Sequence, residues 1–194
     1  MMLFSELSSI CEGRLIQLAN DSAITEIIID SRQSNGSAGS VFFAIDGERH
    51  DGHQFIATLY AKGIRNFVVE KELDTHEFTE GNFLLVRSSI YSLQKLAAYH
   101  RKKYTLPIIG ITGSNGKTII KEWLYQLLSR DYNIVKNPGS YNSQLGVALS
   151  VWQIQEQHQL GLFEAGISKP GEMGHLREII NPTIGIFTNI GTAH

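Results

Sequence analysis

The sequence predicts an α/β protein in two parts, and three observations lead to this prediction. Short β-branched or aromatic runs alternate with segments whose apolar residues recur at helical spacing. After residue 106 the order becomes strictly strand then helix, which predicts a parallel sheet with right-handed crossovers. A helical segment that ends at a proline separates the two regions. We therefore predict two domains, residues 1–105 and residues 106–194.

The composition is that of a chain with a packed core. Its 194 residues are 42% hydrophobic, and 17 basic residues nearly balance 19 acidic ones. This balance predicts no nucleic-acid partner, so any anion must bind at a local site. The start lacks a basic region, and no apolar run approaches the ~18 residues of a membrane span. With Cys11 as a lone, buried cysteine, we expect a cytoplasmic protein without membrane insertion.

The first domain is expected to be a small α/β unit. Its predicted helical segments are FSELSSI and HQFIATLYAKGI, and its predicted strands are ITEIIID, SVFFAI, NFVVE and FLLV. Residues 30–40, DSRQSNGSAGS, are rich in Ser, Gly and Asn, which predicts a loop of the kind that often carries function. Residues 89–107 then predict a helix that ends at Pro107, with the run HRKK as its solvated, basic end.

The second domain is expected to be a parallel sheet with flanking helices. Its predicted strands are PIIGIT, NIV, LGLFEAG and TIGIFTNI. Its predicted helices are residues 117–130, QLGVALSVWQIQ and GEMGHLREII. In sheets of this kind, ligands bind at the carboxyl ends of the strands, so the residues that follow each strand are the candidates for a site.

One stretch, residues 107–124, combines an apolar strand, a glycine turn and the start of a helix. The turn and the helix start consist of Gly113, Ser114, Asn115, Gly116, Lys117 and Thr118. Glycines let backbone amides approach an anion, and the helix N-terminus adds its dipole. Lys117 can neutralise β- and γ-phosphate oxygens, and the Thr118 hydroxyl can bind Mg²⁺. The stretch therefore predicts a binding loop for ATP with its Mg²⁺.

The spacing of this loop departs from the common Gly-x-x-x-x-Gly-Lys-Thr rule. Residue 111 is isoleucine, and Gly110 stands one position too early. The loop is either a shorter variant or an ordinary turn between a strand and a helix. Its place in a strand-helix-strand unit favours phosphate binding. The second domain is thus predicted to be an incomplete parallel sheet of the P-loop ATPase type.

Three further residues are expected at the same sheet edge. Glu164 emerges from an apolar strand, where an acid is costly unless it is paired or bound to a metal, so it is the expected second contact of Mg²⁺. Asn142 could hydrogen-bond a transferring phosphoryl group, or it could be a helix N-cap. His194, six residues after Thr188, is either an exposed residue or a ligand.

Taken together, these motifs resemble those of the ATP-dependent Mur ligases of peptidoglycan synthesis. GITGSNGKT, SYNSQLG, FEAGIS and TNIGTAH occur in the order and at the intervals of that family, whose own loop is the short variant. With DSR at 30–32 and GERHDGHQFI at 47–56, they are similar to the member that adds D-alanyl-D-alanine to UDP-N-acetylmuramoyl-tripeptide (UDP-MurNAc-tripeptide). LYAKGIRNFVVE, KEWLYQLLS and FEAGISKPGEM are similar to a form fused to an alanine racemase. The resemblance implies an N-terminal fragment of such a ligase, because the family continues beyond the last motif.

The resemblance implies amide formation driven by ATP through an acyl phosphate. The catalytic residues that it implies are Lys117, Asn142 and His194. The implied Mg²⁺ contacts are Thr118, Glu164 and His194. The implied residues for the UDP-sugar are Ser31, Arg32, Asp51, Gly52 and His53. Catalysis would then consist of positioning and charge neutralisation.

Several alternatives stay open. Arg32 could pair with a surface acid, and Asp51 could cap a helix start. A sibling ligase that adds a diamino acid and a non-catalytic nucleotide-binding module are alternative functions. We expect no ligase activity from the fragment alone, and an uncovered sheet edge predicts self-association. The histidines that show no ligand spacing are expected at the surface: His50, His76, His100, His158 and His175.

Overall fold

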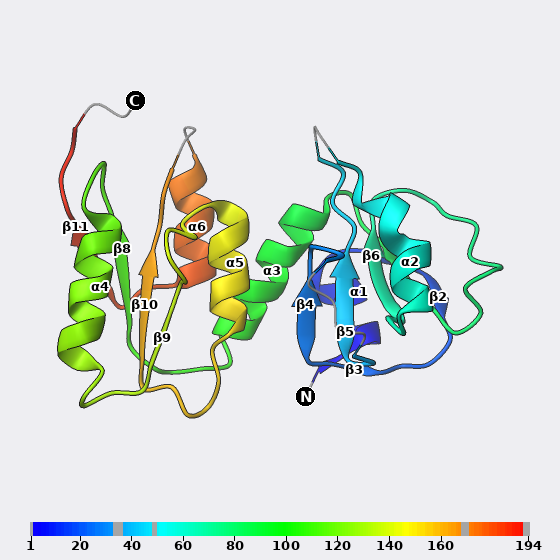
Figure 1. The fold of residues 1–194 in the computed structure, drawn as a ribbon, viewed down its shortest axis with the longest axis horizontal. Coiled ribbons are helices and arrows are strands. Elements are labelled where there is room, and N and C mark those ends of the chain that lie inside the picture. The colour runs from blue at the N-terminus through cyan, green and yellow to red at the C-terminus, as the bar shows by residue number, and fades with distance from the viewer. Residues whose placement is uncertain (1, 33–36, 48–49, 168–170, 192–194) are drawn as a thin grey trace. The chain divides into compact units, whose positions relative to one another are not determined.

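The computed structural model describes residues 2–32, 37–47, 50–167 and 171–191, and Figure 1 shows its helices and strands. The chain divides into two compact units, residues 1–96 and residues 97–194. The division falls inside helix α3 (Ser89–Arg101), close to the predicted boundary near residue 105, which stays a prediction. None of the helices in the described part of the chain is both long and apolar enough to cross a lipid bilayer.

The first unit is built on a five-stranded sheet in the order β2-β7-β6-β5-β4. Its strands are β2 (Arg14–Leu18), β4 (Glu26–Ile28), β5 (Ser40–Phe43), β6 (Asn66–Val69) and β7 (Asn82–Leu85). Strand β2 pairs antiparallel with β7, and the other pairs are parallel. The remaining elements are β1 (Met2–Leu3), β3 (Ala23–Ile24), α1 (Leu7–Ile10), α2 (Ile56–Ala61) and the 3₁₀ helices η1 (Phe4–Glu6) and η2 (Gly52–Phe55).

Apolar side chains cover both faces of the central strands of this sheet. All four residues of β5 and all four of β6 are buried, as expected of parallel strands that are covered on both sides. On one face, helix α2 packs Ile56 and Leu59 against Phe42, Phe67 and Phe83. The predicted strands and helices of this region are confirmed. Strand β2 was not predicted, because a register shift between Leu15 and Gln17 interrupts its alternation of apolar and polar residues.

Two residues of the sequence analysis can be placed in the cores. Cys11 is buried as expected, and desolvation raises the pKa of its thiol to about 12. The expectation for His100 was wrong, because its side chain is half-buried. Its ring lies 4.5 Å from that of Trp152, and its Nε2 lies 2.9 Å from the carbonyl of Ile154. Desolvation lowers the pKa of this imidazole.

The second unit is a four-stranded sheet in the order β11-β8-β10-β9, and every pair is parallel. Its strands are β8 (Ile108–Thr112), β9 (Ile134–Lys136), β10 (Leu160–Glu164) and β11 (Ile184–Phe187). Its helices are α4 (Lys117–Leu128), α5 (Gln144–Trp152) and α6 (Glu172–Ile180). The predicted parallel sheet with its alternating helices is therefore confirmed.

Helix α4 covers one face of this sheet, and α5 and α6 lie together on the other (Figure 1). On the α4 face, Ile109 and Ile111 of β8 and Leu162 of β10 pack against apolar side chains that include Ile120 and Leu124. Alternate residues of a strand point to the same face. The last residue of β10, Glu164, therefore points toward α4, as Leu162 does.

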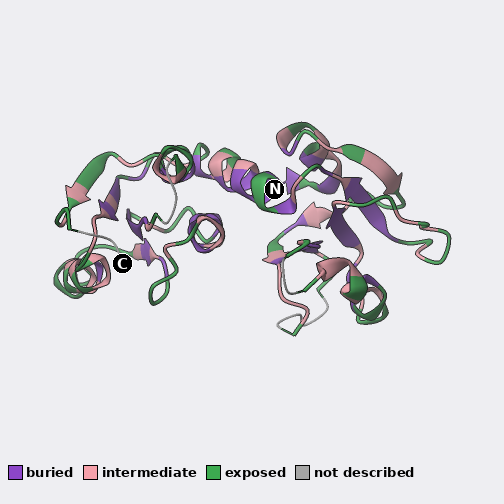
Figure 2. Ribbon diagram, turned by 90° about the horizontal axis from the view of Figure 1, so that it is seen from above, coloured by how far each residue is buried: buried purple, intermediate pink, exposed green. Residues whose placement is uncertain are grey.

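Strand β11 lies at one edge of this sheet, and Figure 2 draws it in the colours of intermediate and exposed residues. Its Ile184 and Phe187 are both more than half exposed. On α4, the residues Ile119, Trp123 and Leu127 recur every fourth position and are also more than half exposed. Self-association through these surfaces stays a prediction.

Candidate functional sites

The glycine loop joins the end of β8 to the start of α4, as predicted. Gly113 has φ of +134° and Gly116 has φ of +82°, which are conformations that side-chain-bearing residues rarely adopt. Gly116 is the N-cap of α4 and provides no capping side chain. The first amides of the helix, including those of Lys117 and Thr118, therefore lack an intrahelical acceptor. Such a helix start can accept an anion.

Two amides of the loop are already engaged, which sequence reasoning missed. Ser114 N donates to the carbonyl of Asn189, and Asn115 N donates to the Oδ1 atom of Asn189, each at 3.0 Å. A Cβ atom on Gly113 would lie only 2.1 Å from the Oγ1 atom of Thr188. The absence of a side chain at Gly113 therefore lets Thr188 and Asn189 approach the loop, and the predicted part of Gly113 in nucleotide binding stays a prediction.

The side chain of Lys117 folds back over the loop. Its Nζ donates to the carbonyl oxygens of Gly113, at 2.7 Å, and of Ser114, at 3.3 Å. These acceptors hold the ammonium beside the helix start. A phosphate there would be attracted by the ammonium and by the partial positive charge of the helix N-terminus. The predicted role of Lys117 as a phosphate contact is therefore compatible with its position.

Thr118 and Glu164 are brought together by the packing of α4 on the sheet. The Thr118 hydroxyl donates to Glu164 Oε2 at 2.9 Å. Glu164 is fully buried, and its Oε1 has no hydrogen-bond partner among the described residues. A buried carboxylate oxygen without a partner is costly, and a hydroxyl with a carboxylate is a donor set that Mg²⁺ accepts. These residues therefore fit the predicted Mg²⁺ position.

In the described part of the chain, no three His, Cys, Asp or Glu residues gather into a set that could hold a metal without further ligands. This finding agrees with Mg²⁺ that is held mainly by nucleotide phosphates, because Mg²⁺ usually takes only one or two protein carboxylates. His194, predicted as a catalytic residue and a metal contact, lies outside the described residues. Both of its roles stay predictions.

Asn142 lies beside the end of β10. The carbonyl of Asn142 accepts a hydrogen bond from Gly166 N at 2.8 Å. Its side chain leaves no room for a Cβ on Gly166, which would come within 2.8 Å of the Asn142 Oδ1 atom. The alternative role as an N-cap is wrong, because Ser143 caps α5 and accepts from Gly146 N. The predicted phosphoryl contact of Asn142 stays open.

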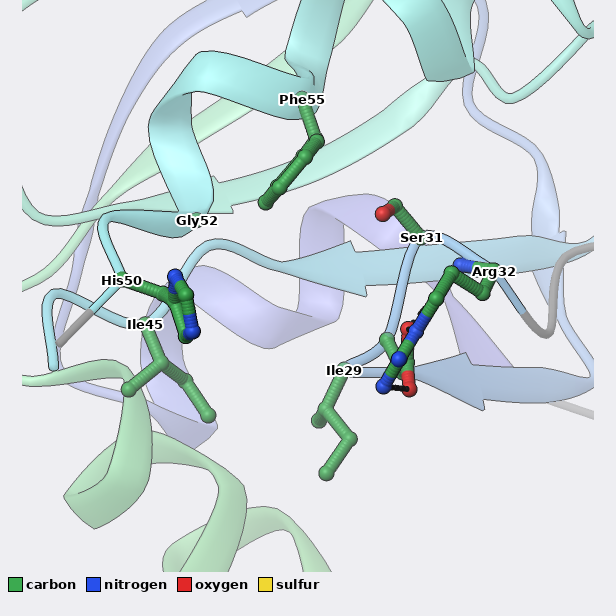
Figure 3. A pocket seen from close by; sticks show the side chains of 8 residues that line it. Ile29, Ser31, Arg32, Ile45, His50, Gly52 and Phe55 are labelled. Carbon is green, nitrogen blue, oxygen red and sulfur yellow. Dashed lines mark hydrogen bonds and ion pairs between the residues drawn. The ribbon is translucent and has the colours of Figure 1, made fainter.

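A second candidate site is a pocket of about 480 Å³ in the first unit. Its lining residues are Ile29, Asp30, Ser31, Arg32, Ile45, His50, Gly52 and Phe55. Figure 3 shows Ile29, Ser31 and Arg32 on one side, with Ile45 and His50 opposite and Phe55 above. Of the predicted substrate-binding residues, Ser31, Arg32 and Gly52 line this pocket.

The pocket combines one charged group with apolar walls. Arg32 donates to both carboxylate oxygens of Asp30, at 2.9 and 2.7 Å, so the alternative of pairing with a surface acid is confirmed. The hydrogen bonds from Arg32 lower the pKa of Asp30 to about 2. The Arg32 side chain is 87% exposed, and the described residues engage only part of its fork of five donors. The remaining donors can meet an anion.

Asp51 and His53 do not line the pocket but hold the segment beside it. Asp51 caps η2 by accepting from His53 N, which confirms the alternative role as a cap. Its Oδ2 lies 2.7 Å from Lys71 Nζ, which also pairs with Asp46 at 2.8 Å. The His53 ring accepts from Glu70 N at 2.9 Å through Nε2. These contacts position the segment that brings His50 and Gly52 to the pocket.

Sequence reasoning missed Phe55, Ile29, Ile45 and His50. Phe55, Ile29 and Ile45 belong to apolar patterns, and residues of such patterns lie in a core more often than in a ligand pocket. Phe55 stands in GERHDGHQFI, three residues after Gly52. Its place just after this turn was the only local feature that could have marked it as a pocket residue. His50 is exposed, as expected of the surface histidines, but its place in the pocket lining was not foreseen. Only the folded sheet brings residues 29–32 beside residues 45–55.

Replacing Asp51 with Asn should lower the stability of the chain in a pH-dependent way. The hydrogen bond from Lys71 is the main cause that lowers the pKa of Asp51 below its ordinary 3.8. A carboxylate with a lowered pKa stabilises the folded state above pH 3.8 and loses this contribution as the pH falls further. We expect a loss of at most about 1 kcal/mol at pH 7, because the pair is partly exposed.

The measurement is thermal unfolding of the wild type and Asp51→Asn from pH 7 down to pH 3. The difference in Tm should shrink below pH 4. Asp74→Asn is the matched control, because Asp74 is largely exposed, and it should leave Tm unchanged. An equal difference at pH 7 and pH 3 would contradict the assignment.

Both units match models of one protein family. The Mur ligase middle domain matches residues 111–194, and the Mur ligase family, catalytic domain, matches residues 23–110. The chain belongs to the Mur ligase family. The glycine loop, Glu164 and Asn142 of this Mur ligase lie in the first match, and the pocket with Arg32 lies in the second. The predicted family and fold are thereby confirmed.

Several relatives of this Mur ligase share the name of one enzyme. UDP-N-acetylmuramoyl-tripeptide--D-alanyl-D-alanine ligase of Synechocystis sp. is 34% identical over 184 residues, which are 95% of this chain and 40% of that protein. A crystal structure of MurF from Acinetobacter baumannii is 32% identical with a TM-score of 0.87, and the match covers 98% of this chain and 41% of that one.

A further solved structure contains a nucleotide. It is MurF ligase from Thermotoga maritima in complex with ADP, 31% identical with a TM-score of 0.77 over 87% of this chain and 38% of that one. The Mur ligase chain described here thus spans about 40% of the length of the relatives that it matches. Its resemblance to a form fused to alanine racemase finds no support in these names.

Proposed function

We propose that this chain provides the nucleotide site and the UDP-sugar site of an ATP-dependent ligase that adds D-alanyl-D-alanine to UDP-MurNAc-tripeptide. One observation carries the proposal. At the N-terminal end of α4, the Thr118 hydroxyl donates to a fully buried Glu164 whose second oxygen has no hydrogen-bond partner among the described residues. The names of the relatives supply the reaction class, and one of them is a complex with ADP.

The chemistry needs an activated carboxylate, because a free carboxylate would have to expel oxide. The γ-phosphoryl group of ATP passes to an oxygen of the tripeptide carboxylate, which gives an acyl phosphate and ADP. The amine of D-alanyl-D-alanine attacks the acyl carbon, phosphate leaves with the C–O electron pair, and the amine nitrogen loses a proton. Catalysis of this kind rests on positioning and charge neutralisation.

The residues of the second unit would share this work. Lys117 would leave the loop carbonyls and neutralise phosphate oxygens, and the opening amides of α4 would donate to them. Thr118 and Glu164 would hold Mg²⁺, which supplies neutralisation of the phosphate charge. Asn142, beside the end of β10, would contact the transferring group.

The pocket of the first unit would take the UDP-sugar. Arg32 would offer its remaining donors to the diphosphate, because its planar fork matches phosphate oxygens. Phe55 with Ile29 and Ile45 would provide apolar walls for a ring. Asp51 and His53 would act through the segment that they hold.

Two calorimetric titrations of the chain test this function, one with UDP-MurNAc-tripeptide and one with Mg-ADP. We expect both ligands to bind. Arg32→Met should lower the affinity for UDP-MurNAc-tripeptide and leave the affinity for Mg-ADP unchanged. Arg87→Met is a matched control because it removes an arginine outside the pocket lining of the same unit. A chain that binds Mg-ADP and ignores UDP-MurNAc-tripeptide would be a plain nucleotide-binding module.

Other expectations stay predictions. The names of the relatives favour the D-alanyl-D-alanine-adding member over a sibling that adds a diamino acid. Fusion to an alanine racemase, a cytoplasmic location, inactivity of this chain alone and self-association are predictions of the sequence, and sedimentation of the purified chain would test the last.

A further inference from the structure

A lysine that sequence reasoning passed over lies at the centre of the second unit. Lys121 stands one helical turn beyond Thr118 on α4, and it is fully buried. Lysine is almost never fully buried unless its charge is paired, because desolvation of an ammonium is costly. The buried ammonium of Lys121 must therefore be compensated by the groups around it.

The ammonium of Lys121 has two backbone acceptors and a buried acid beside it. Its Nζ donates to the carbonyl of Asn137 at 2.9 Å and to the carbonyl of Gly139. It lies 3.8 Å from Glu164 Oε1 and 3.5 Å from Oε1 of the partly exposed Glu122. The distance to Glu164 is that of an ion pair without a hydrogen bond. Lys121 thus balances the charge of Glu164 and leaves the lone pairs of Oε1 free.

The buried side chain of Asn137 completes the connection. Its Oδ1 accepts from Glu164 N at 2.9 Å, and its Nδ2 donates to the carbonyls of Glu164 and Tyr141 at 3.0 and 2.7 Å. Lys121 and Asn137 therefore join three elements: helix α4, the end of β10, and the segment 137–142 that ends in Asn142. A shift of any one of them would disturb both buried side chains.

We propose that Lys121 is a positioning residue of the nucleotide site, which holds Glu164 toward Thr118 and ties the segment 137–142 to helix α4. The proposal rests on the proposed function for its link to Mg²⁺. It differs from the expected role of Lys117, whose ammonium lies on the loop carbonyls. Lys121 faces the carboxylate from the protein interior, and it acts through Glu164 and the segment rather than on the nucleotide.

The first test is a double-mutant cycle with Lys121→Met, Glu164→Gln and the double variant, read as Tm without ligand. Lys121→Met leaves Glu164 buried and unpaired, so Tm should fall by roughly 10 °C. Adding Glu164→Gln removes that buried charge, and the double variant should regain a large part of the loss. Losses that simply add would overturn the charge pairing. If neither Lys121→Met nor the double variant folds, Lys121 is only a backbone contact and the proposal fails.

The second test compares ADP binding with Mg²⁺ and with EDTA. Lys121→Met should lower the affinity for Mg-ADP by ~10-fold or more, because residues that orient a metal ligand typically contribute 10–100-fold to metal affinity. The same substitution should change the affinity for metal-free ADP by less than about 3-fold, because binding without Mg²⁺ relies on the loop and not on Glu164. Lys136→Met is the matched control, because Lys136 also pairs with Glu122 but not with Glu164, and its affinities should equal those of the wild type.

Equal losses with and without Mg²⁺, or none, would overturn the role of Lys121 at the metal position. A wild-type chain that binds no Mg-ADP would count against the proposed function. In that case the Tm cycle, which needs no nucleotide, would still decide whether Lys121 positions Glu164.

Discussion

Replacing Gly113 with alanine should destabilise the second unit by roughly 3–5 kcal/mol. Two costs add: the strain of a side chain at φ of +134° and the overlap of the new Cβ with Thr188 Oγ1, 2.1 Å away. Backbone atoms of Asn189 lie 3.0 Å from the same position, so the neighbouring segment would have to move. Urea unfolding of the two proteins, followed by the fluorescence of Trp123 and Trp152, would measure the loss.

Gly116→Ala is the matched control for this substitution. Gly116 also has a positive φ, +82°, but a Cβ there would meet no atom of the described residues within 4 Å. We therefore expect a loss of only about 1–2 kcal/mol, which is the strain of the left-handed conformation. Gly113→Ala combined with Thr188→Ala should recover part of the larger loss. Similar losses for the two glycines would show that the approach of Thr188 is not what requires Gly113.

Replacing Lys117 with Met should weaken ADP binding by about 10- to 100-fold, because a hydrogen bond to a charged group contributes about 1.5–3 kcal/mol. Tm should change little, since among the described residues the ammonium is bonded only to carbonyls of its own loop. Titration of the chain with ADP, with and without Mg²⁺, would measure both affinities. The loss should appear in both conditions, which distinguishes Lys117 from Lys121.

Lys103→Met is a suitable control for that experiment. Lys103 lies just beyond α3 and stands over the ring of Tyr99, so its removal changes the net charge equally without touching the loop. Its affinity for ADP should equal that of the wild type. If Lys117→Met bound ADP as the wild type does, the loop would not hold phosphate through this lysine, and the proposed function would lose its main contact.

The local features of the nucleotide site could be predicted from the sequence. An apolar run, two glycines and Gly-Lys-Thr before a helical pattern specify a strand, a turn and a helix start through interactions within about ten residues. Glu164 could also be found, because an acid that ends an apolar strand is an anomaly at any sheet edge. The family resemblance added the roles, and the matched domains support the family.

The remainder depended on contacts between segments far apart in the chain. Asn189 occupies loop amides 74 and 75 residues earlier in the chain, and nothing near Gly113 in the sequence announces it. Nothing in the local helical pattern singles out Lys121, because its burial follows from the segment after β9 folding over it. Phe55 and His50 line a pocket only because β4 and β5 are neighbours.

The sequence by itself determined the alternation of strands and helices, the glycine loop with its lysine and threonine, and the acid at the end of β10. The strands, helices and loop follow from local periodicity and turn residues. The acid is noticeable because a carboxylate in an apolar strand is costly unless it has a partner. Only the tertiary structure decided that Thr118 and Glu164 meet, that Gly113 makes room for Thr188, and that Lys121 is buried beside Glu164. The physical reason is that burial and charge pairing depend on the register of parallel strands and on the face that each helix covers, and these are fixed by packing across the whole sheet.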